Sequence, residues 1–352
     1  MNDAPVIHQY HTSDRAELFD FIREAYSPAD SARLLTQWVW KYESSPATIA
    51  DDFDITFIRI GRKMVGLSSA FRLRMWMGGI ECPGEGRGTF ITHPDYRGRN
   101  LWRNIGNLKR PFTPVQFGWS RLPPRVGERL GRLSDPVRPL IRIFDVGPFF
   151  EYFARSRFLG SIGTAASTAV RVASSPLRRA RGGVVRLDSF DDRADRFWER
   201  SRRPDLAMLI RDHRYLNWRF CQRPDATYNL YGIERGSELE GFLVARATTY
   251  RGMRWGYLVD FLAPENDREV LPSLIDAALD EFRRVGVAAV SCVATDPAVR
   301  RILFRAGFFP APQRKPIHFM RRTQRTRADL AKFMAIQCWY LTMGDGDLEL
   351  AP

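Results

Sequence analysis

Cysteine is scarce in this sequence and is not spaced for metal binding. The four cysteines are scattered along 352 residues, and no two of them form a C-x-x-C pair. This spacing is unlike a zinc motif or a disulfide framework, and it is typical of proteins in reducing compartments. Acidic residues near the C-terminus (345–349) have no neighbouring ligands and would usually stay solvated. We therefore expect a cytoplasmic protein without a bound metal ion.

Long apolar runs are also missing. The N-terminal stretch MNDAPVIHQY lacks the basic and then apolar regions of a signal peptide. The longest uncharged stretch, residues 158–170, is too short and too rich in small residues to cross a bilayer. We expect no membrane-spanning segment, while peripheral contact with a membrane surface stays open.

Acidic residues are few in the middle of the chain. Residues 97–181 contain seventeen Lys and Arg but four acidic residues, and the whole chain has a formal charge of +14. Such a field favours anionic partners: a phosphorylated cofactor, a nucleotide-sugar, nucleic acid or an anionic membrane. An Arg-rich solvated surface with no single partner explains it equally well. Nucleic acid is not expected, because no known reading motif accompanies the basic tracts 312–315 and 321–327.

The order of expected strands and helices occurs twice. An apolar fraction of 44%, with 24 Phe and 9 Trp, indicates a folded protein. The alternation predicts an α/β protein with an open mixed sheet (α+β) and helices on its faces, built twice. We place the two domains at 1–148 and 184–330. A basic linker at 149–183 would join them, and a C-terminal helix and tail would occupy 331–352.

A short internal repeat supports the duplication. Trp40-Lys41-Tyr42 followed by Pro46 matches Trp218-Arg219-Phe220 followed by Pro224, with identical spacing. Each copy lies at the end of an expected helix, where the proline disfavours helical geometry in the residue before it. We expect the aromatic side chains to be buried and structural.

The segment THPDYRGRNLWRNI places the end of a strand, a basic turn with a glycine and the start of a helix in succession. Unpaired N–H groups in such a turn, together with the helix dipole, attract a pyrophosphate. Arg97, Arg99 and Arg103 add positive charge. An ordinary basic turn is the alternative.

This segment resembles the cofactor loop of the GNAT (GCN5-related N-acetyltransferase) superfamily. His93, Pro94, Tyr96, Arg97 and Gly98 match its frequent V-H-P-x-Y-R-G-x-G stretch in order. The resemblance implies two tandem acyl-CoA N-acyltransferase domains, with acetyl-CoA or another acyl-CoA as co-substrate at the first. Phe117 to Ser120 would form the opposite wall, across the pantetheine arm of the cofactor from Ile91 and Thr92. The implied cofactor-binding residues are Ile91, Thr92, Arg97, Gly98, Arg99, Asn100, Leu101 and Trp102.

Two positions depart from the family pattern. Asn100 and Trp102 stand where small residues are expected. Asn tolerates a left-handed backbone, so the loop shape can persist. Trp102 either packs aside or fills the space that a pyrophosphate needs.

In the second half, the equivalent stretch Pro264 to Arg268 has no glycine and two acids, which would repel a pyrophosphate. The C-terminal W-x-x-T-x-G-D-x-D, which begins at Trp339, also resembles that of a tandem branch of the superfamily.

Direct transfer needs a general base. Glu85, which precedes the expected fourth strand, is the candidate, against the alternative of a solvated loop acid. The favoured function is acyl transfer to an amino group of a sugar, peptide or small metabolite. The alternatives are a GNAT-derived pseudoenzyme that serves as a binding or assembly module, and nucleic-acid or membrane-surface binding through the basic middle region.

Overall fold

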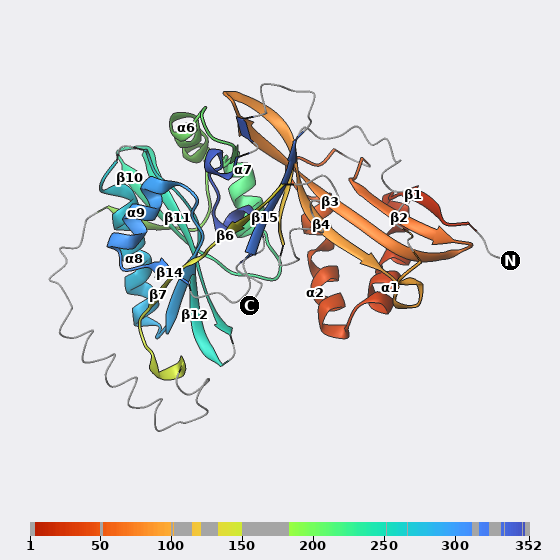
Figure 1. Ribbon diagram of the computed structural model, residues 1–352. Helices are drawn as coiled ribbons and strands as arrows, with labels where there is room; N and C mark the ends of the chain where they lie inside the picture. The colour runs from red at the N-terminus through yellow and green to blue at the C-terminus, as the bar shows by residue number, and fades with distance from the viewer. Residues whose placement is uncertain are drawn as a thin grey trace.

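Two sheets lie side by side in the computed structural model (Figure 1). The structure describes residues 4–49, 52–99, 101, 115–120, 133–149, 183–250, 252–265, 267–311, 317–323, 332–333, 335–346 and 348. The described strands of the first sheet run in the order β1-β2-β3-β4-β5-β15-β6, with β9 paired to β3. Those of the second sheet run β14-β7-β13-β12-β11-β10-β8. The expected mixed α/β architecture is confirmed.

The strands of the first sheet are β1 (Val6–Gln9), β2 (Ile55–Ile60), β3 (Lys63–Met77), β4 (Ile80–Thr92), β5 (Val115–Ser120), β6 (Leu133–Val137), β9 (Met208–Leu209) and β15 (Ile317–Thr323). Those of the second are β7 (Leu140–Ile143), β8 (Val184–Leu187), β10 (Asn229–Arg235), β11 (Glu238–Tyr250), β12 (Met253–Leu262), β13 (Ala289–Cys292) and β14 (Phe309–Pro310). Helices α1 (Arg15–Ala25) and α2 (Pro28–Trp38) accompany the first sheet. Helices α6 (Asp192–Ser201), α7 (His213–Leu216), α8 (Val270–Arg284) and α9 (Pro297–Arg305) accompany the second.

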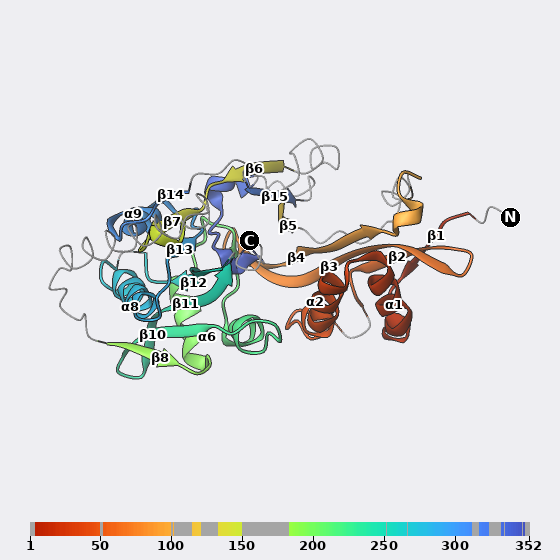
Figure 2. The same cartoon turned by 90° about the horizontal axis from the view of Figure 1, so that it is seen from below.

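Helices α1 and α2 cover one face of the first sheet (Figure 2). Ser27 caps α2 by accepting a hydrogen bond from the Asp30 N–H at 3.2 Å, and Pro28 takes the first helical position, where no N–H is needed. Beneath the helices, Phe57 and Leu67 are buried on this face. Alternate residues of the strands face the other way, and Ile58 and Val65 form a small cluster there.

Strand β4 starts earlier than the sequence predicts. Its glycines are typical of a turn, but in the structure they lie inside the strand. Side chains at Gly84 and Gly86 would collide with Met75 and Phe71 on β3. These glycines therefore let two large side chains cross the face of the sheet. Glu85 accordingly belongs to a strand and is buried, which corrects its expected place in a solvated loop.

The sheets exchange strands. Strand β7 follows β6 after two residues, yet it joins the second sheet, between β13 and β14. Strand β15, late in the chain, inserts between β5 and β6 of the first sheet. The domain boundaries 1–148 and 184–330 stay a prediction for the chain. The two sheets do not follow these boundaries, because each sheet contains at least one strand from the other range. The described part of 331–352 forms short 3-10 turns, η7 (Ile336–Cys338) and η8 (Met343–Asp345).

The two copies of the internal repeat meet each other. Each lies in a single π-helical turn, η2 (Val39–Glu43) or η5 (Asn217–Cys221). The indoles of Trp40 and Trp218 stack with centroids 4.9 Å apart and planes 18° apart. Trp40 Nε1 donates to the Trp218 carbonyl at 2.7 Å, and Trp218 Nε1 donates to the Trp40 carbonyl at 2.9 Å. This reciprocal contact has the form of a two-fold interface inside one chain.

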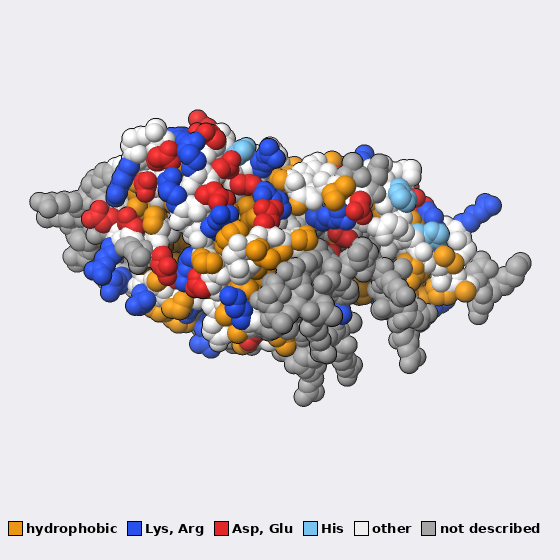
Figure 3. All heavy atoms as spheres, turned by 90° about the horizontal axis from the view of Figure 1, so that it is seen from above, with side chains coloured by type: hydrophobic (Ala, Val, Ile, Leu, Met, Phe, Trp, Pro, Cys, Tyr) orange, Lys and Arg blue, Asp and Glu red, His pale blue; other side chains and the backbone are white. Residues whose placement is uncertain are grey.

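Charge on the described surface of the second half is largely paired. Figure 3 shows Lys/Arg and Asp/Glu side chains intermixed there. On α6, Arg193 contacts Asp191 and Glu234, at 2.9 and 2.8 Å. Most of the basic stretch 97–181 lies outside the described residues, so the binding of nucleic acid or membranes through it stays a prediction.

Candidate functional site

A gap opens in the first sheet between β4 and β5. The two strands pair in parallel from Gly84 to Gly86, opposite Val115 to Phe117, and the described pairing stops there. On its other side β4 carries a β-bulge, because Gly88 and Thr89 together face Ser69 of β3. A bulge bends its strand. The described pairing of β4 with β5 thus ends just before the bulge.

A hydroxyl network fixes the bulge. The Thr89 N–H lies 2.8 Å from Ser69 Oγ and 3.2 Å from the Tyr42 hydroxyl oxygen, which both accept from it. Ser69 Oγ in turn donates to the Tyr42 hydroxyl at 2.8 Å. A Cβ at Gly88 would collide with both hydroxyls. Tyr42, the third residue of the repeat, therefore holds the bulge at the point where the strands part.

A cavity of about 350 Å³ lies at this gap. Its described walls come from α2, η2, β3, the bulge of β4, β5, the start of β15 and the C-terminal segment. Phe117 to Ser120, the four residues expected to form one wall beside the pantetheine arm, all line it. Its volume is in the range of small-molecule sites.

The predicted pyrophosphate loop follows β4 by way of a 3-10 turn, η3 (Pro94–Tyr96). Gly98 has φ +79°, which favours glycine, and a Cβ there would meet no atom within 4 Å. Arg97 and Arg99 are exposed, and the Arg99 guanidinium lies 4.7 Å from the ring centroid of Tyr96. The loop presents two cations around a glycine, as the sequence predicts.

Leu101 anchors the end of this loop. It is buried against Ile58 and Val65, on the face of the sheet opposite α1 and α2. Ile91 points the other way, into the core beneath those helices, and the Thr92 carbonyl accepts from Arg97 Nε at 3.4 Å. Asn100 and Trp102 lie outside the described residues. Contact of all these residues with a cofactor stays a prediction.

Glu85 does not line the cavity. Its neighbours Gly84 and Gly86 face Met75 and Phe71, so strand alternation turns Glu85 to the opposite face. There its carboxylate accepts a hydrogen bond from Gln116 Nε2 at 2.6 Å. Its role as general base stays a prediction that no cavity contact supports.

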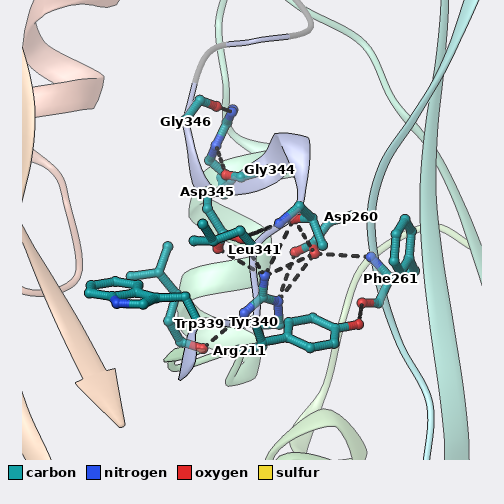
Figure 4. A network of polar contacts seen from close by, with 12 residues as sticks. Arg211, Asp260, Phe261, Trp339, Tyr340, Leu341, Gly344, Asp345 and Gly346 are labelled. Atoms are coloured by element: carbon teal, nitrogen blue, oxygen red, sulfur yellow. Dashed lines mark hydrogen bonds and ion pairs between the residues drawn. The ribbon is translucent and has the colours of Figure 1, made fainter. Parts of the chain in front are cut away.

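The second sheet has a matching gap, but it is filled. Strands β12 and β13 pair in parallel only as far as Leu258 and Cys292, and β12 carries a bulge at Val259. Beyond that point the C-terminal segment contacts the end of β12 (Figure 4) and also pairs with Ala294, which follows β13. Tyr340 donates to the Phe261 carbonyl at 2.7 Å, and Thr342 bridges to Ala294.

A buried ionic cluster holds this segment. The Arg211 side chain is 0% exposed and contacts Asp260 at 3.1 Å and Asp345 at 2.8 Å. Thr342 Oγ1 donates to Asp260 at 2.9 Å. Burial raises the pKa of Asp345 to about 6, although Arg211 opposes the shift. The segment from Trp339 to Asp345 thus closes the second gap, and Asp345 is buried there, which corrects its expected solvated place.

The equivalent of the pyrophosphate loop in the second half is occupied as well. Asp267 Oδ1 accepts from the N–H groups of Glu269 and Val270, both at 2.7 Å, at the start of α8. Glu265 pairs with Arg203 at 3.1 Å. The N–H groups that would attract a pyrophosphate already serve a carboxylate, as the acidic sequence of this stretch suggests.

Sequence reasoning missed Arg211 and Asp260, because each stands alone among ordinary loop or strand residues and meets Asp345 only through the fold. For Tyr42, the repeat predicts a structural role only. One signal could have found it: the second copy has Phe220 at this position, so the hydroxyl occurs only in the first copy.

Within the described ranges, no group of three or more His, Cys, Asp or Glu could hold a metal ion. The same part of the chain contains no helix that is both long and apolar enough to cross a membrane.

No family model matches the sequence, and no curated protein matches it. Among solved structures, the chain resembles Saccharomyces cerevisiae N-myristoyltransferase with bound myristoyl-CoA, with a TM-score of 0.59 and 14% identity over 93% of this chain and 80% of that one. A GCN5-related N-acetyltransferase from Anabaena variabilis gives a TM-score of 0.55 and 12% identity, over 91% and 73% of the two chains. The chain has the GNAT fold.

A probable N-acyltransferase of unknown function from Enterococcus faecalis has the same fold, with a TM-score of 0.55 and 11% identity over 91% of this chain and 72% of that one. Each likeness covers both sheets, since it spans about nine-tenths of the chain. The GNAT fold expected from the Arg97 loop and the repeat is thereby confirmed.

Proposed function

We propose that this chain is an acyl-CoA-dependent N-acyltransferase whose working site is the gap between β4 and β5. One observation carries the proposal: in a chain with the GNAT fold, the first gap opens onto a cavity of about 350 Å³, while the second is filled by the chain itself. The yeast N-myristoyltransferase structure contains myristoyl-CoA, which supports an acyl-CoA co-substrate. Acetyl-CoA and longer acyl-CoAs are both candidates.

The residues present fit such a co-substrate. The described pairing of β4 with β5 ends at Gly86, and the cavity lies at this point, so a pantetheine arm can enter between the two strands. From the bulge at Thr89 to the end of β4 at Thr92 is roughly 10 Å of strand. The loop of Arg97 and Gly98 follows directly and would hold the pyrophosphate.

The reaction joins the acceptor nitrogen to the acyl carbon. The neutral amine attacks the thioester carbonyl, the C–N bond forms, and the C–S bond breaks. The amine loses one proton to a base or water, and the leaving thiolate gains one, which gives an amide and CoA-SH. Tyr42 and Ser69 act on this step as positioning residues, because they orient the bulge beside the cavity.

Release of CoA-SH, followed with a thiol reagent, tests the proposal with a panel of amines: amino sugars, amino acids and peptides with free N-termini. We expect acyl-CoA to bind and at least one class of amine to release CoA-SH. A protein that binds neither acyl-CoA nor CoA would instead be the binding or assembly module that Asn100 and Trp102 suggested.

A further inference from the structure

A buried threonine lies at the wall of the open cavity. Thr89, at the bulge of β4, is 9% exposed and lines the cavity. Its Oγ1 lies 3.5 Å from the hydroxyl oxygen of Tyr42, which belongs to the core beneath α1 and α2. The Thr89 hydroxyl is therefore on the face of the sheet that these helices cover, at the point where the described pairing of β4 with β5 has ended.

The protons of this hydroxyl network can be assigned in turn, because each hydroxyl carries one proton. Ser69 Oγ accepts from the Thr89 N–H and donates to the Tyr42 hydroxyl, both at 2.8 Å; its contact with the Thr89 carbonyl is longer, at 3.2 Å. The Tyr42 oxygen accepts from Ser69 and from the Thr89 N–H, so its own proton is left for Thr89 Oγ1.

The proton of Thr89 Oγ1 then points away from Tyr42. Among the residues that the structure describes, no other group lies within hydrogen-bond distance of this oxygen. The Thr89 N–H is already bonded to Ser69 and Tyr42. What Thr89 can donate to a ligand in the cavity is thus the hydroxyl proton of its side chain.

The second gap has no such hydroxyl. The bulge of β12 consists of Val259, opposite Val244 and Ala245, and Phe220 stands at the position that matches Tyr42. Apolar side chains are sufficient for a bulge at the gap that the chain itself fills. The hydroxyls occur at the gap that stays open, where a ligand can use them.

A hydrogen-bond donor at this place fits the chemistry of a thioester. When an amine attacks the carbonyl carbon, negative charge develops on the carbonyl oxygen, and a donor already oriented toward that oxygen lowers the barrier. The chain from Ser69 through Tyr42 to Thr89 orients the last hydroxyl, and successive hydrogen bonds of this kind strengthen one another.

We propose that Thr89 is a catalytic residue whose hydroxyl donates a hydrogen bond to the thioester carbonyl oxygen of the acyl-CoA. This inference rests on the proposed function and deepens it, because it names the group that stabilises the oxyanion. The C–N bond forms and the C–S bond breaks as described above. Thr89 keeps its proton throughout, so the proton that the thiolate gains comes from elsewhere.

The test compares three variants of the full chain with wild type. Thr89→Val removes the hydroxyl at nearly constant volume and copies the residue type of the second gap, and Thr89→Ser keeps the hydroxyl. Thr56→Val is the control, because Thr56 is a buried threonine of β2, in the same sheet, that is not among the described lining residues of the cavity. Urea unfolding checks each variant, and Thr89→Ala replaces Thr89→Val if the latter does not fold.

Two measurements are made. The first is kcat for CoA-SH release with an amine that wild type accepts, alongside the Kd for CoA. We expect Thr89→Val to lower kcat about a hundredfold or more, the usual cost of one oxyanion donor, with little change in the Kd for CoA. Thr89→Ser should recover most of kcat, and Thr56→Val should leave it unchanged.

The second measurement is the infrared band of an acyl-CoA labelled with ¹³C at the thioester carbonyl, bound without an amine. A hydrogen bond to the carbonyl oxygen lowers the frequency of this band, whereas a purely structural role of Thr89 would not. We expect a lower frequency in wild type and Thr89→Ser than in Thr89→Val. An unchanged kcat in Thr89→Val, a Thr89→Ser variant as slow as Thr89→Val, or the same band in wild type and Thr89→Val would each overturn the inference.

Wild-type protein separates this inference from the proposed function. If wild type binds no acyl-CoA, or releases no CoA-SH with any amine of the panel, the proposed function itself fails. If wild type is active and Thr89→Val matches it in kcat and in the carbonyl band, only the role of Thr89 fails.

Discussion

Replacing Arg211 with methionine should strongly destabilise the protein. The guanidinium is 0% exposed and compensates two carboxylates, Asp260 and Asp345, that are each 1% exposed. Methionine fills much of the same volume but leaves both acids without a buried cation. Breaking a buried pair in this way typically costs about 3 to 5 kcal/mol. We expect a loss of this size in the free energy of unfolding at about pH 8.

The loss should be smaller in acid. The pKa of Asp345 is raised from 3.8 to about 6 in the fold, so folding favours its protonated form. Its contribution to stability is therefore full below about pH 4 and is lost as the pH rises through about 6. Without Arg211 the pKa of Asp345 rises further, since the cation that lowers it most is gone. At about pH 5 the carboxylate then takes up a proton, and part of the loss is recovered.

Urea unfolding of wild type and Arg211→Met at the two pH values measures this effect, and hydrogen exchange locates it. The amides of Tyr340 and Thr342, bonded to Ala207 and Asp345, should exchange faster in the variant. Arg193→Met is the control, because Arg193 also contacts two acids but at the surface. Loss of similar size in the two variants, or a deficit for Arg211→Met that does not change with pH, would refute the reasoning.

Three further substitutions test the first gap. Tyr42→Phe removes a hydroxyl that orients the bulge, so it should lower kcat for acyl transfer about tenfold or more while KM for acyl-CoA changes little. The control is Phe220→Tyr at the matching position of the second copy, which should leave kcat unchanged. Gly98→Ala should cost roughly 1 kcal/mol of backbone strain and weaken acyl-CoA binding. Its control is Gly236→Ala, at φ +61° in the second half, which should cost similar strain without affecting binding. Arg97→Ala should raise the Kd for CoA about tenfold, with a smaller effect in high salt; a Kd that does not change would remove the loop from the site.

The sequence predicts the local elements well where pattern and length agree. Strands β10 to β12 and helix α8 follow from period and turn chemistry. The start of β4 was missed because Gly84 and Gly86 look like turn residues, while their actual role is to make room for Met75 and Phe71. Such a role depends on the neighbouring strand, which no local pattern contains.

The exchange of β7 and β15 between the sheets could not be predicted either. Pairing of distant strands is decided by burial and hydrogen bonding of the whole sheet, and both segments are short. The repeat of Trp40 and Trp218 did predict two related units, but not that the two copies stack on each other. The candidate site, too, could be predicted only in part from the sequence. The Arg97 loop was visible in the sequence, whereas the cavity, the Tyr42 network and the closed second gap required the fold.

Calorimetric titration of the full chain with acetyl-CoA, a longer acyl-CoA and CoA tests the central claim most directly. We expect at least one acyl-CoA to bind with a stoichiometry of one per chain, because the first gap is open and residues 339–345 fill the second. We also expect Arg97→Ala to weaken this binding. Two equivalent sites per chain, or no binding of any of the three ligands, would contradict the account.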